Sequence, residues 1–156
     1  MGHLDPRTFV GETASDLKNE IDVIEKFCKF GKCSYFKMPA RERVDFVLYR
    51  GHHRYVVAIA EIKCRYDHNF WDWGDIICSL HKKAHCVMYA EAIGVPAFLI
   101  SKHNDGIFYC DMRDPFWECR IIKDPRNRDS SDETPCVSWS GKSVKQLFVT
   151  EHVSSS

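Results

Sequence analysis

Two acidic residues and a lysine are spaced so that they can meet at one end of a small β-sheet. Residues 44–65 contain two apolar runs that flank a Gly-His-His-Arg turn, a pattern typical of two antiparallel strands joined by a hairpin. Asp45 lies near the start of the first run, and Glu61 and Lys63 lie near the end of the second. In an antiparallel hairpin these positions are neighbours, and side-chain alternation puts Glu61 and Lys63 on one face. The spacing therefore predicts that two carboxylates and an ammonium group converge.

These charges need an explanation, because both runs are apolar on both faces. Buried charges are costly unless they are paired, hydrated or bound to a metal ion. A salt-bridge cluster, in which Asp45 or Glu61 pairs with Lys63, is one explanation. We favour a site for chemistry, because an acid in one strand and an acid-x-Lys triplet in the next occur together.

This pattern resembles the signature of the PD-(D/E)XK nuclease superfamily, which is an acid on one core strand and acid-x-Lys on the next. Here the pattern is Asp45 followed by Glu61-Ile62-Lys63, and Val44 stands where many members have proline. The resemblance covers about residues 15–112. It implies an α/β protein with a restriction-endonuclease-like α/β/α core, in which helices flank a mixed β-sheet. It also implies phosphodiester hydrolysis with Mg²⁺ or Mn²⁺ as the cofactor.

The resemblance implies a role for each residue of the pattern. Asp45 and Glu61 would be catalytic metal ligands, and the backbone carbonyl of Ile62 would be a further ligand. Lys63 would orient the attacking water or stabilise the charge that develops on the phosphate.

A first helix is predicted to end at Gly31, because Leu17, Ile21, Ile24 and Cys28 fall on one helical stripe. In the superfamily an acid from this helix often completes the metal site. The resemblance therefore implies a catalytic and metal-binding role for Glu20, which lies on the flank of the stripe, with Glu25 as the second choice. The alternative is that Glu20 is a boundary glutamate paired with a lysine.

The net charge is zero, which argues against a protein that coats nucleic acid. Residues 26–54, however, carry eight lysines and arginines against two acids. A basic region beside an acidic cluster suits a nuclease, because cations hold the phosphate backbone and acids hold the metal. The candidate nucleic-acid-binding residues are Lys37, Arg41, Arg43, Arg65 and Lys82.

Lys82 is included because similar phage and bacterial nucleases carry a lysine or glutamine on the helix after the acid-x-Lys strand. A helical projection of residues 75–93 nevertheless puts Lys82 opposite the apolar face. The segment before this helix holds Trp71 and Trp73. They could stack on unpaired bases or wedge a duplex, but we favour packing of both rings against the fold.

The other elements are predicted from apolar runs and turn residues. Strands are expected at 33–38, 95–101, 106–112 and 115–122, an edge strand at 136–139, and a short helix at 144–148. We interpret the whole chain, 1–156, as a single nuclease-like domain with an N-terminal arm (1–12), a mobile loop (123–135) and a frayed tail (150–156).

The eight cysteines form no Cys-x-x-Cys pair, and the N-terminus lacks a secretory signal, so we expect reduced thiols in a cytoplasmic protein. Phage origin and action in the host cytoplasm are compatible with this expectation. No apolar run is long enough to predict a membrane span. A structural zinc site is the sharper alternative for the cysteines, with ligands from Cys78, His81, His85 and Cys86.

The sequence has no Gly-x-Ser-x-Gly, P-loop or Gly-x-Gly-x-x-Gly motif that would favour another chemistry. The expected function is that of a metal-dependent DNA endonuclease, with junction-resolvase-like structure selectivity and a homodimeric state left open. The sequence does not separate DNA from RNA as the partner. The alternatives are a DNA exonuclease and a non-catalytic nucleic-acid-binding or zinc-stabilised interaction module on the same fold.

Overall fold

A six-stranded mixed sheet forms the centre of the computed structural model, which describes residues 14–67, 69–123 and 133–148. The strand order is β1-β2-β3-β5-β6-β9, and β3 and β5 are the parallel pair. The strands are β1 (Ser34–Lys37), β2 (Phe46–Arg50), β3 (Tyr55–Arg65), β5 (Ala97–His103), β6 (Gly106–Asp111) and β9 (Lys145–Leu147). The predicted hairpin of β2 and β3 and the predicted strands around 95–112 are confirmed.

Helix α2 (Ala14–Gly31) covers one face of this large sheet. Its buried residues include Val23, Ile24 and Phe27, which pack in one apolar cluster with Phe46 of β2 and Ile62 of β3. The predicted helix and its apolar stripe are therefore confirmed. Burial of this stripe, more than intrinsic propensity, stabilises the helix.

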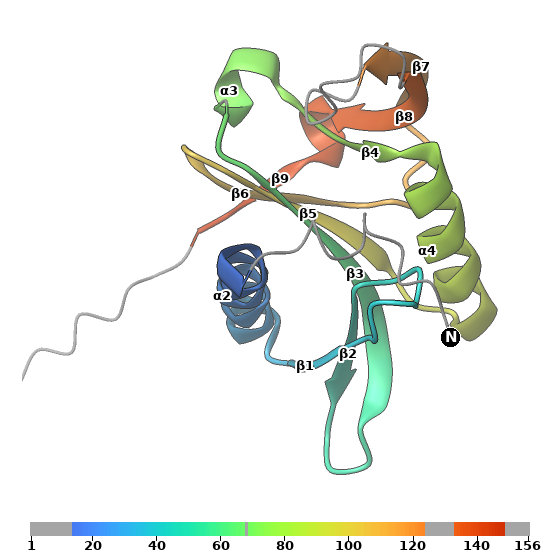
Figure 1. Ribbon diagram of the computed structural model, residues 1–156. Coiled ribbons are helices and arrows are strands. Elements are labelled where there is room, and N and C mark those ends of the chain that lie inside the picture. Colours follow the sequence, from blue (N-terminus) through green and yellow to red (C-terminus); the bar gives the residue numbers. More distant parts are fainter. Residues whose placement is uncertain (1–13, 68, 124–132, 149–156) are drawn as a thin grey trace, which may run out of the picture.

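The opposite face is covered by α4 (Leu80–Ile93) and by a small sheet with the strand order β4-β8-β7. The three strands are β4 (Asp75–Ser79), β8 (Glu133–Ser140) and β7 (Trp117–Lys123). Figure 1 shows α2 on one side of the large sheet and α4 with the small sheet on the other. The chain thus has the predicted α/β architecture, with a mixed sheet between two layers. No helix in the described part of the chain is long and apolar enough to span a membrane.

The prediction of a helix over the whole of 75–93 is wrong at its start. Residues 75–79 form β4, in which Ile76 and Cys78 are buried and their neighbours are less so, the period of a strand. Ser79 then has an extended backbone, and its hydroxyl accepts a hydrogen bond from the amide of Lys82 at 3.2 Å. This N-cap ends the strand and begins the helix.

The later start also changes which face of α4 is buried. Cys86 and Ala90 are buried, whereas Leu80 and Met88 are 39% and 55% exposed. Lys82 precedes Cys86 by four residues and therefore shares the buried stripe. The prediction that Lys82 lies opposite this stripe is wrong, because small residues, and not the large apolar ones, face the sheet.

The C-terminal elements also differ from the predictions. Residues 145–147 form β9, antiparallel to β6, and not the expected helix. β8 is the middle strand of the small sheet and not an edge strand. Short apolar runs do not distinguish such cases, because the partner strand decides them. The predicted arm and tail, and residues 124–132 of the predicted loop, lie outside the described residues, while 123 and 133–135 belong to strands.

The aromatic segment before β4 contains the short helix α3 (Phe70–Trp73). Phe70 is buried and stacks on Phe108, with 3.9 Å between ring centroids. Trp71 and Trp73 are 69% and 71% exposed. The interpretation that both tryptophans pack against the fold holds only in part: Trp71 meets Phe70 and Phe108 edge-on, whereas Trp73 stays largely exposed, and the buried Phe70 is the main anchor.

Candidate active site

The register of the β2–β3 hairpin brings the two acids together. Phe46 pairs with Ala60, so the next position along the hairpin places Asp45 opposite Glu61. Both carboxylates lie on the α4 side of the large sheet, because Phe46 and Ala60 face α2 and side chains alternate. One carboxylate oxygen of Asp45, Oδ2, accepts a hydrogen bond from the amide of Ile62 at 3.4 Å.

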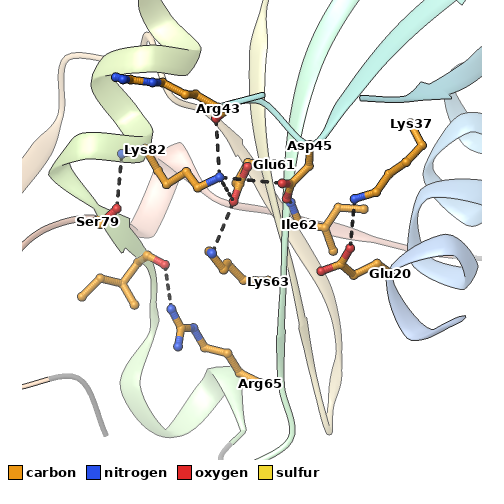
Figure 2. Close-up of polar contacts among 11 residues, drawn as sticks. Glu20, Lys37, Arg43, Asp45, Glu61, Ile62, Lys63, Arg65, Ser79 and Lys82 are labelled. Carbon is orange, nitrogen blue, oxygen red and sulfur yellow. Dashed lines mark hydrogen bonds and ion pairs between the residues drawn. The ribbon is translucent and has the colours of Figure 1, made fainter. Parts of the chain in front are cut away.

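Two lysines reach the acids from different elements (Figure 2). The Nζ atom of Lys63 lies 3.3 Å from Glu61 Oε1. Lys82 Nζ, from the first turn of α4, lies 3.5 Å from the same oxygen and 3.7 Å from Asp45 Oδ1. It also donates to the backbone carbonyl of Arg43 at 3.5 Å. Lys82 therefore bridges both carboxylates, although the sequence offered it only as a nucleic-acid contact.

Glu61 is the most unusual group of this cluster, since its side chain is only 1% exposed. Burial raises the pKa of Glu61 to about 7, Lys63 and Lys82 oppose that rise, and the neighbouring Asp45 carboxylate adds to it. Burial acts to lower the pKa of Lys82, but Glu61 and Asp45 outweigh it and raise that pKa above its ordinary value. Lys82 is thus held in its charged form, whereas burial leaves the Glu61 carboxyl more easily protonated than an ordinary glutamate in spite of the two lysines.

The donor set of the cluster fits a hard divalent cation. Glu61 Oε2 is buried and has no hydrogen-bond partner within the described chain, so it is an oxygen ready for a ligand. Mg²⁺ commonly binds one or two carboxylates and keeps several waters. Asp45 and Glu61 match this requirement. No cluster of three or more His, Cys, Asp or Glu side chains arranged for a metal occurs in the described ranges, so further ligands would be waters or backbone carbonyls.

The alternative zinc set is not assembled. Cys78 and Cys86 are buried with burial-raised pKa values of about 12, which disfavours the thiolate form that zinc requires. The ring of His85 instead meets the guanidinium of Arg43, with 2.6 Å between Nε2 and Nη1. His81 stacks edge-on against His85 and does not join the two thiols in a metal-binding group.

Glu20 lies on the other side of β3 from this cluster (Figure 2). One of its oxygens, Oε2, is 3.7 Å from Lys37 Nζ. Lys37 pairs in register with Phe46 and sits over its ring, which places both charges on the α2 face. Glu25, the second choice, accepts a hydrogen bond from the hydroxyl of Tyr35 at 3.1 Å. The structure therefore brings neither helix glutamate to the acids of the hairpin.

The candidate nucleic-acid-binding residues are divided in the same way. Lys37 is on the α2 face, whereas Arg43 lies beside Lys82 at the start of α4. Arg65 donates from Nη2 to the carbonyl of Ile77 at 3.1 Å and so ties β3 to β4. Arg41 is exposed in the segment between β1 and β2. Only Arg43, Arg65 and Lys82 therefore border the acidic cluster or the strand that leads from it.

Sequence analysis missed a polar pair and a cleft next to the cluster. Ser101 pairs in register with Lys63, and its hydroxyl lies 2.8 Å from Nε2 of the buried His103. A cleft of about 550 Å³ extends from Lys63 and Lys82 toward Arg120 on β7. The Ser101–His103 pair lies within one strand, but its place beside Lys63 depends on the pairing of distant strands, as does the cleft, and no local signal reveals that placement.

The chain matches a protein-family model over residues 7–142, a span that contains every residue of the cluster. The description of that family is "Phage putative PDDEXK endonuclease". A solved structure similar to this chain is Hjc, a Holliday junction resolvase from the archaeal hyperthermophile Archaeoglobus fulgidus. The match has a TM-score of 0.45 and 11% sequence identity, and it covers 80% of each chain. No curated protein matches the chain.

Proposed function

We propose that this chain, which belongs to the phage PDDEXK endonuclease family, is a metal-dependent endonuclease that hydrolyses phosphodiester bonds in DNA. The observation that carries the proposal is the convergence of Asp45, Glu61, Lys63 and Lys82, in which a buried oxygen of Glu61 is left without a partner. An unsatisfied buried acceptor destabilises the fold, which favours a ligand on this oxygen over a purely structural ion-pair cluster.

Asp45 and Glu61 are the residues that would hold the ion, with Mg²⁺ or Mn²⁺ as the expected species. When bound, a divalent ion supplies an activated water and neutralises charge on the phosphate. The amide of Ile62 orients the carboxylate of Asp45 through its hydrogen bond. The carbonyl of Ile62 remains a proposed further ligand.

The lysines supply positive charge to the substrate. Lys63 is 22% exposed, so its ammonium group can contact both Glu61 and a phosphate oxygen in the cleft. We assign it the orientation of the attacking water and the stabilisation of the developing negative charge. Lys82 balances the charge of the two acids from the opposite side. A phage enzyme of this kind meets its DNA in the cytoplasm of the host cell, where we place its action.

The test is cleavage of closed circular plasmid, linear duplex, single-stranded DNA and a four-way junction, with Mg²⁺ or Mn²⁺ against EDTA. The wild type should nick the plasmid only when metal is present. Such nicking identifies an endonuclease, because a closed circle has no end for an exonuclease. Lys63→Ala should abolish nicking. Lys26→Ala is the matched control, since Lys26 pairs with Asp22 on α2 at 2.9 Å, away from the cluster. It should cut like the wild type.

The substrate comparison also separates the alternatives. Preference for the junction would indicate resolvase-like selectivity, and cutting of only the linear molecules would indicate an exonuclease. Folded wild-type protein that cuts none of the four substrates with either metal would refute the proposal and favour a binding module.

A further inference from the structure

The cleft beside the acidic cluster is lined by several basic residues. It lies between the end of β3 and the small sheet, and it has a volume of about 550 Å³. Its basic residues are Lys63, Arg65, Lys82, Arg120 and Lys123. Its acidic residues are Asp67 and Asp75, and Asp75 pairs with Arg120 at 3.4 Å. Lys63 and Lys82 also pair with Glu61 and Asp45 at the inner end, so five basic groups face four acidic ones. The small positive excess, which lies toward Arg120 and Lys123, suits a polyanion.

The size of the cleft restricts the form of that polyanion. A volume of about 550 Å³ is typical of sites for small molecules and is enough for one or two nucleotides. A double helix cannot enter such a space, because its two strands are held together as one broad rod. A single strand can enter and place its phosphates along Arg120 and Lys123. The size of the cleft therefore favours unpaired nucleotides over a double helix inside it.

Trp73 lines this cleft and offers an aromatic surface, since its side chain is 71% exposed. Its support is rigid. The carboxylate of Asp105 caps α3 by accepting hydrogen bonds from the amides of Phe70 at 2.8 Å and Trp71 at 3.1 Å. Gly74 then ends the helix with a left-handed φ of 72°. The backbone that carries Trp73 is thus held beside the cations of the cleft.

We propose that the cleft binds unpaired nucleotides of the DNA substrate and that Trp73 stacks on one of their bases. The inference rests on the proposed function, because it places these nucleotides next to the phosphodiester bond whose hydrolysis Asp45 and Glu61 would support by holding the metal ion. The substrate is then DNA with unpaired nucleotides beside the cleavage point, such as forks, flaps and single-stranded junction arms.

Binding should be measured in EDTA, where cleavage cannot occur, by fluorescence anisotropy of labelled DNA. The two ligands are a forked duplex with unpaired arms and a blunt duplex of the same length. Trp73→Ala should weaken binding of the fork by about 5-fold to 100-fold, the range expected for one stacked base, and leave the blunt duplex unchanged. Trp71→Ala is the matched control, because Trp71 is 69% exposed on the same helix but does not line the cleft. It should bind both ligands like the wild type.

A second variant tests the proposed phosphate contact of Lys123 and leaves the ring of Trp73 unaltered. Lys123→Gln should reduce the slope of the logarithm of fork affinity against the logarithm of salt concentration by about 0.7, the value for one phosphate contact on a single strand. Lys26→Gln should leave this slope unchanged, because Lys26 lies on α2. Thermal melting of each variant verifies that it is folded.

Three results would overturn the inference: equal fork affinity for the wild type and Trp73→Ala, equal losses for Trp71→Ala and Trp73→Ala, or wild-type affinity for blunt duplex as high as for the fork. Plasmid nicking with Mg²⁺ that persists beside any of these results would leave the endonuclease proposal intact. Fork binding that depends on Trp73, without any metal-dependent cutting, would support nucleotide binding in the cleft and refute the endonuclease proposal.

Discussion

The two faces of the large sheet are built from the same strands but use charge in opposite ways. On the α2 face, β3 contributes Ala60 and Ile62 to a continuous apolar cluster, and the charged pair of Glu20 and Lys37 lies beside it. On the α4 face, β3 contributes Ile59 to the apolar core and then Glu61, which is buried with only 1% exposed. Alternation of side chains along one strand therefore separates a stabilising face from a reactive one.

The difference shows how a candidate site can be told from ordinary ion pairing. Glu20 can be explained as an ordinary ion pair with Lys37, which costs little free energy because its carboxylate is partly exposed at the margin of a helix. Glu61 is almost wholly buried, and this burial raises its pKa even though two lysines lie beside it. Such an arrangement lowers stability, so its presence points to a role in binding or catalysis.

The largest difference between the two faces should appear when Glu61 and Glu20 are each replaced by glutamine in separate variants. Glu61→Gln removes a carboxylate that would hold the ion, and we expect the rate of Mg²⁺-dependent plasmid nicking to fall by about a hundredfold to a thousandfold. Glu20→Gln, the matched change on the α2 face, should leave the rate within about threefold of the wild type. An equal loss in Glu20→Gln would break the comparison and bring Glu20 back as a ligand.

A smaller effect is expected on stability in EDTA as the pH is varied. The pKa of Glu61 is about 7 in the folded protein against 4.5 for the ordinary group, so the unfolded chain loses its proton first as the pH rises. Glu61 therefore makes no difference below pH 4.5, lowers the free energy of unfolding progressively between 4.5 and about 7, and lowers it fully above 7. The full loss corresponds to about 3 kcal/mol.

Urea unfolding of the wild type and of Glu61→Gln across this pH range measures the effect. The free energy of unfolding of the wild type should fall relative to that of the variant as the pH rises. Glu20→Gln provides the comparison from the other face. Parallel pH profiles for the wild type and Glu61→Gln would show that Glu61 titrates normally in the fold.

The smallest effect compares one lysine from each face. Lys82→Met leaves two adjacent carboxylates without their bridging cation, so the metal-free protein should lose about 2 kcal/mol of stability, and saturating Mg²⁺ should restore most of it. Lys37→Met breaks a half-exposed pair and should cost less than about 1 kcal/mol, with no recovery on adding Mg²⁺. Thermal melting with and without Mg²⁺ measures both. Equal responses of the two variants to Mg²⁺ would remove the distinction between the faces.

The acids of the hairpin could be predicted from sequence because their relation is local. Glu61 and Lys63 belong to β3, and Asp45 directly precedes the adjacent antiparallel strand β2, so alternation together with one short turn fixes their faces. The layered α/β architecture also followed from local patterns, since the first helix and the strands at 34–37, 46–65 and 97–111 coincide with the expected segments.

The position of Lys82 could not be predicted, because it depends on where α4 begins. Ile76 and Ile77 extend the apolar pattern backwards from the helix, yet they lie in β4, whose pairing with β8 involves residues about 60 positions later in the chain. For Glu20, a helical projection gives the flank of the helix but not the face of the sheet that the helix covers. The cleft requires β4, β7 and β8 to be placed together, which no local pattern reveals.

The parallel pairing of β3 and β5 has a consequence for how the charges of the site come into balance. Parallel strands need a long crossover connection, and here that connection contains α3, β4 and α4. Both acids therefore belong to a hairpin that closes locally, whereas Lys82 arrives only on the crossover. A nascent chain with the hairpin alone carries the two acids against a single lysine, Lys63, and so has an excess of negative charge at this place. Electrical neutrality at this site is thus a property of the completed tertiary structure, and no single segment of the chain possesses it.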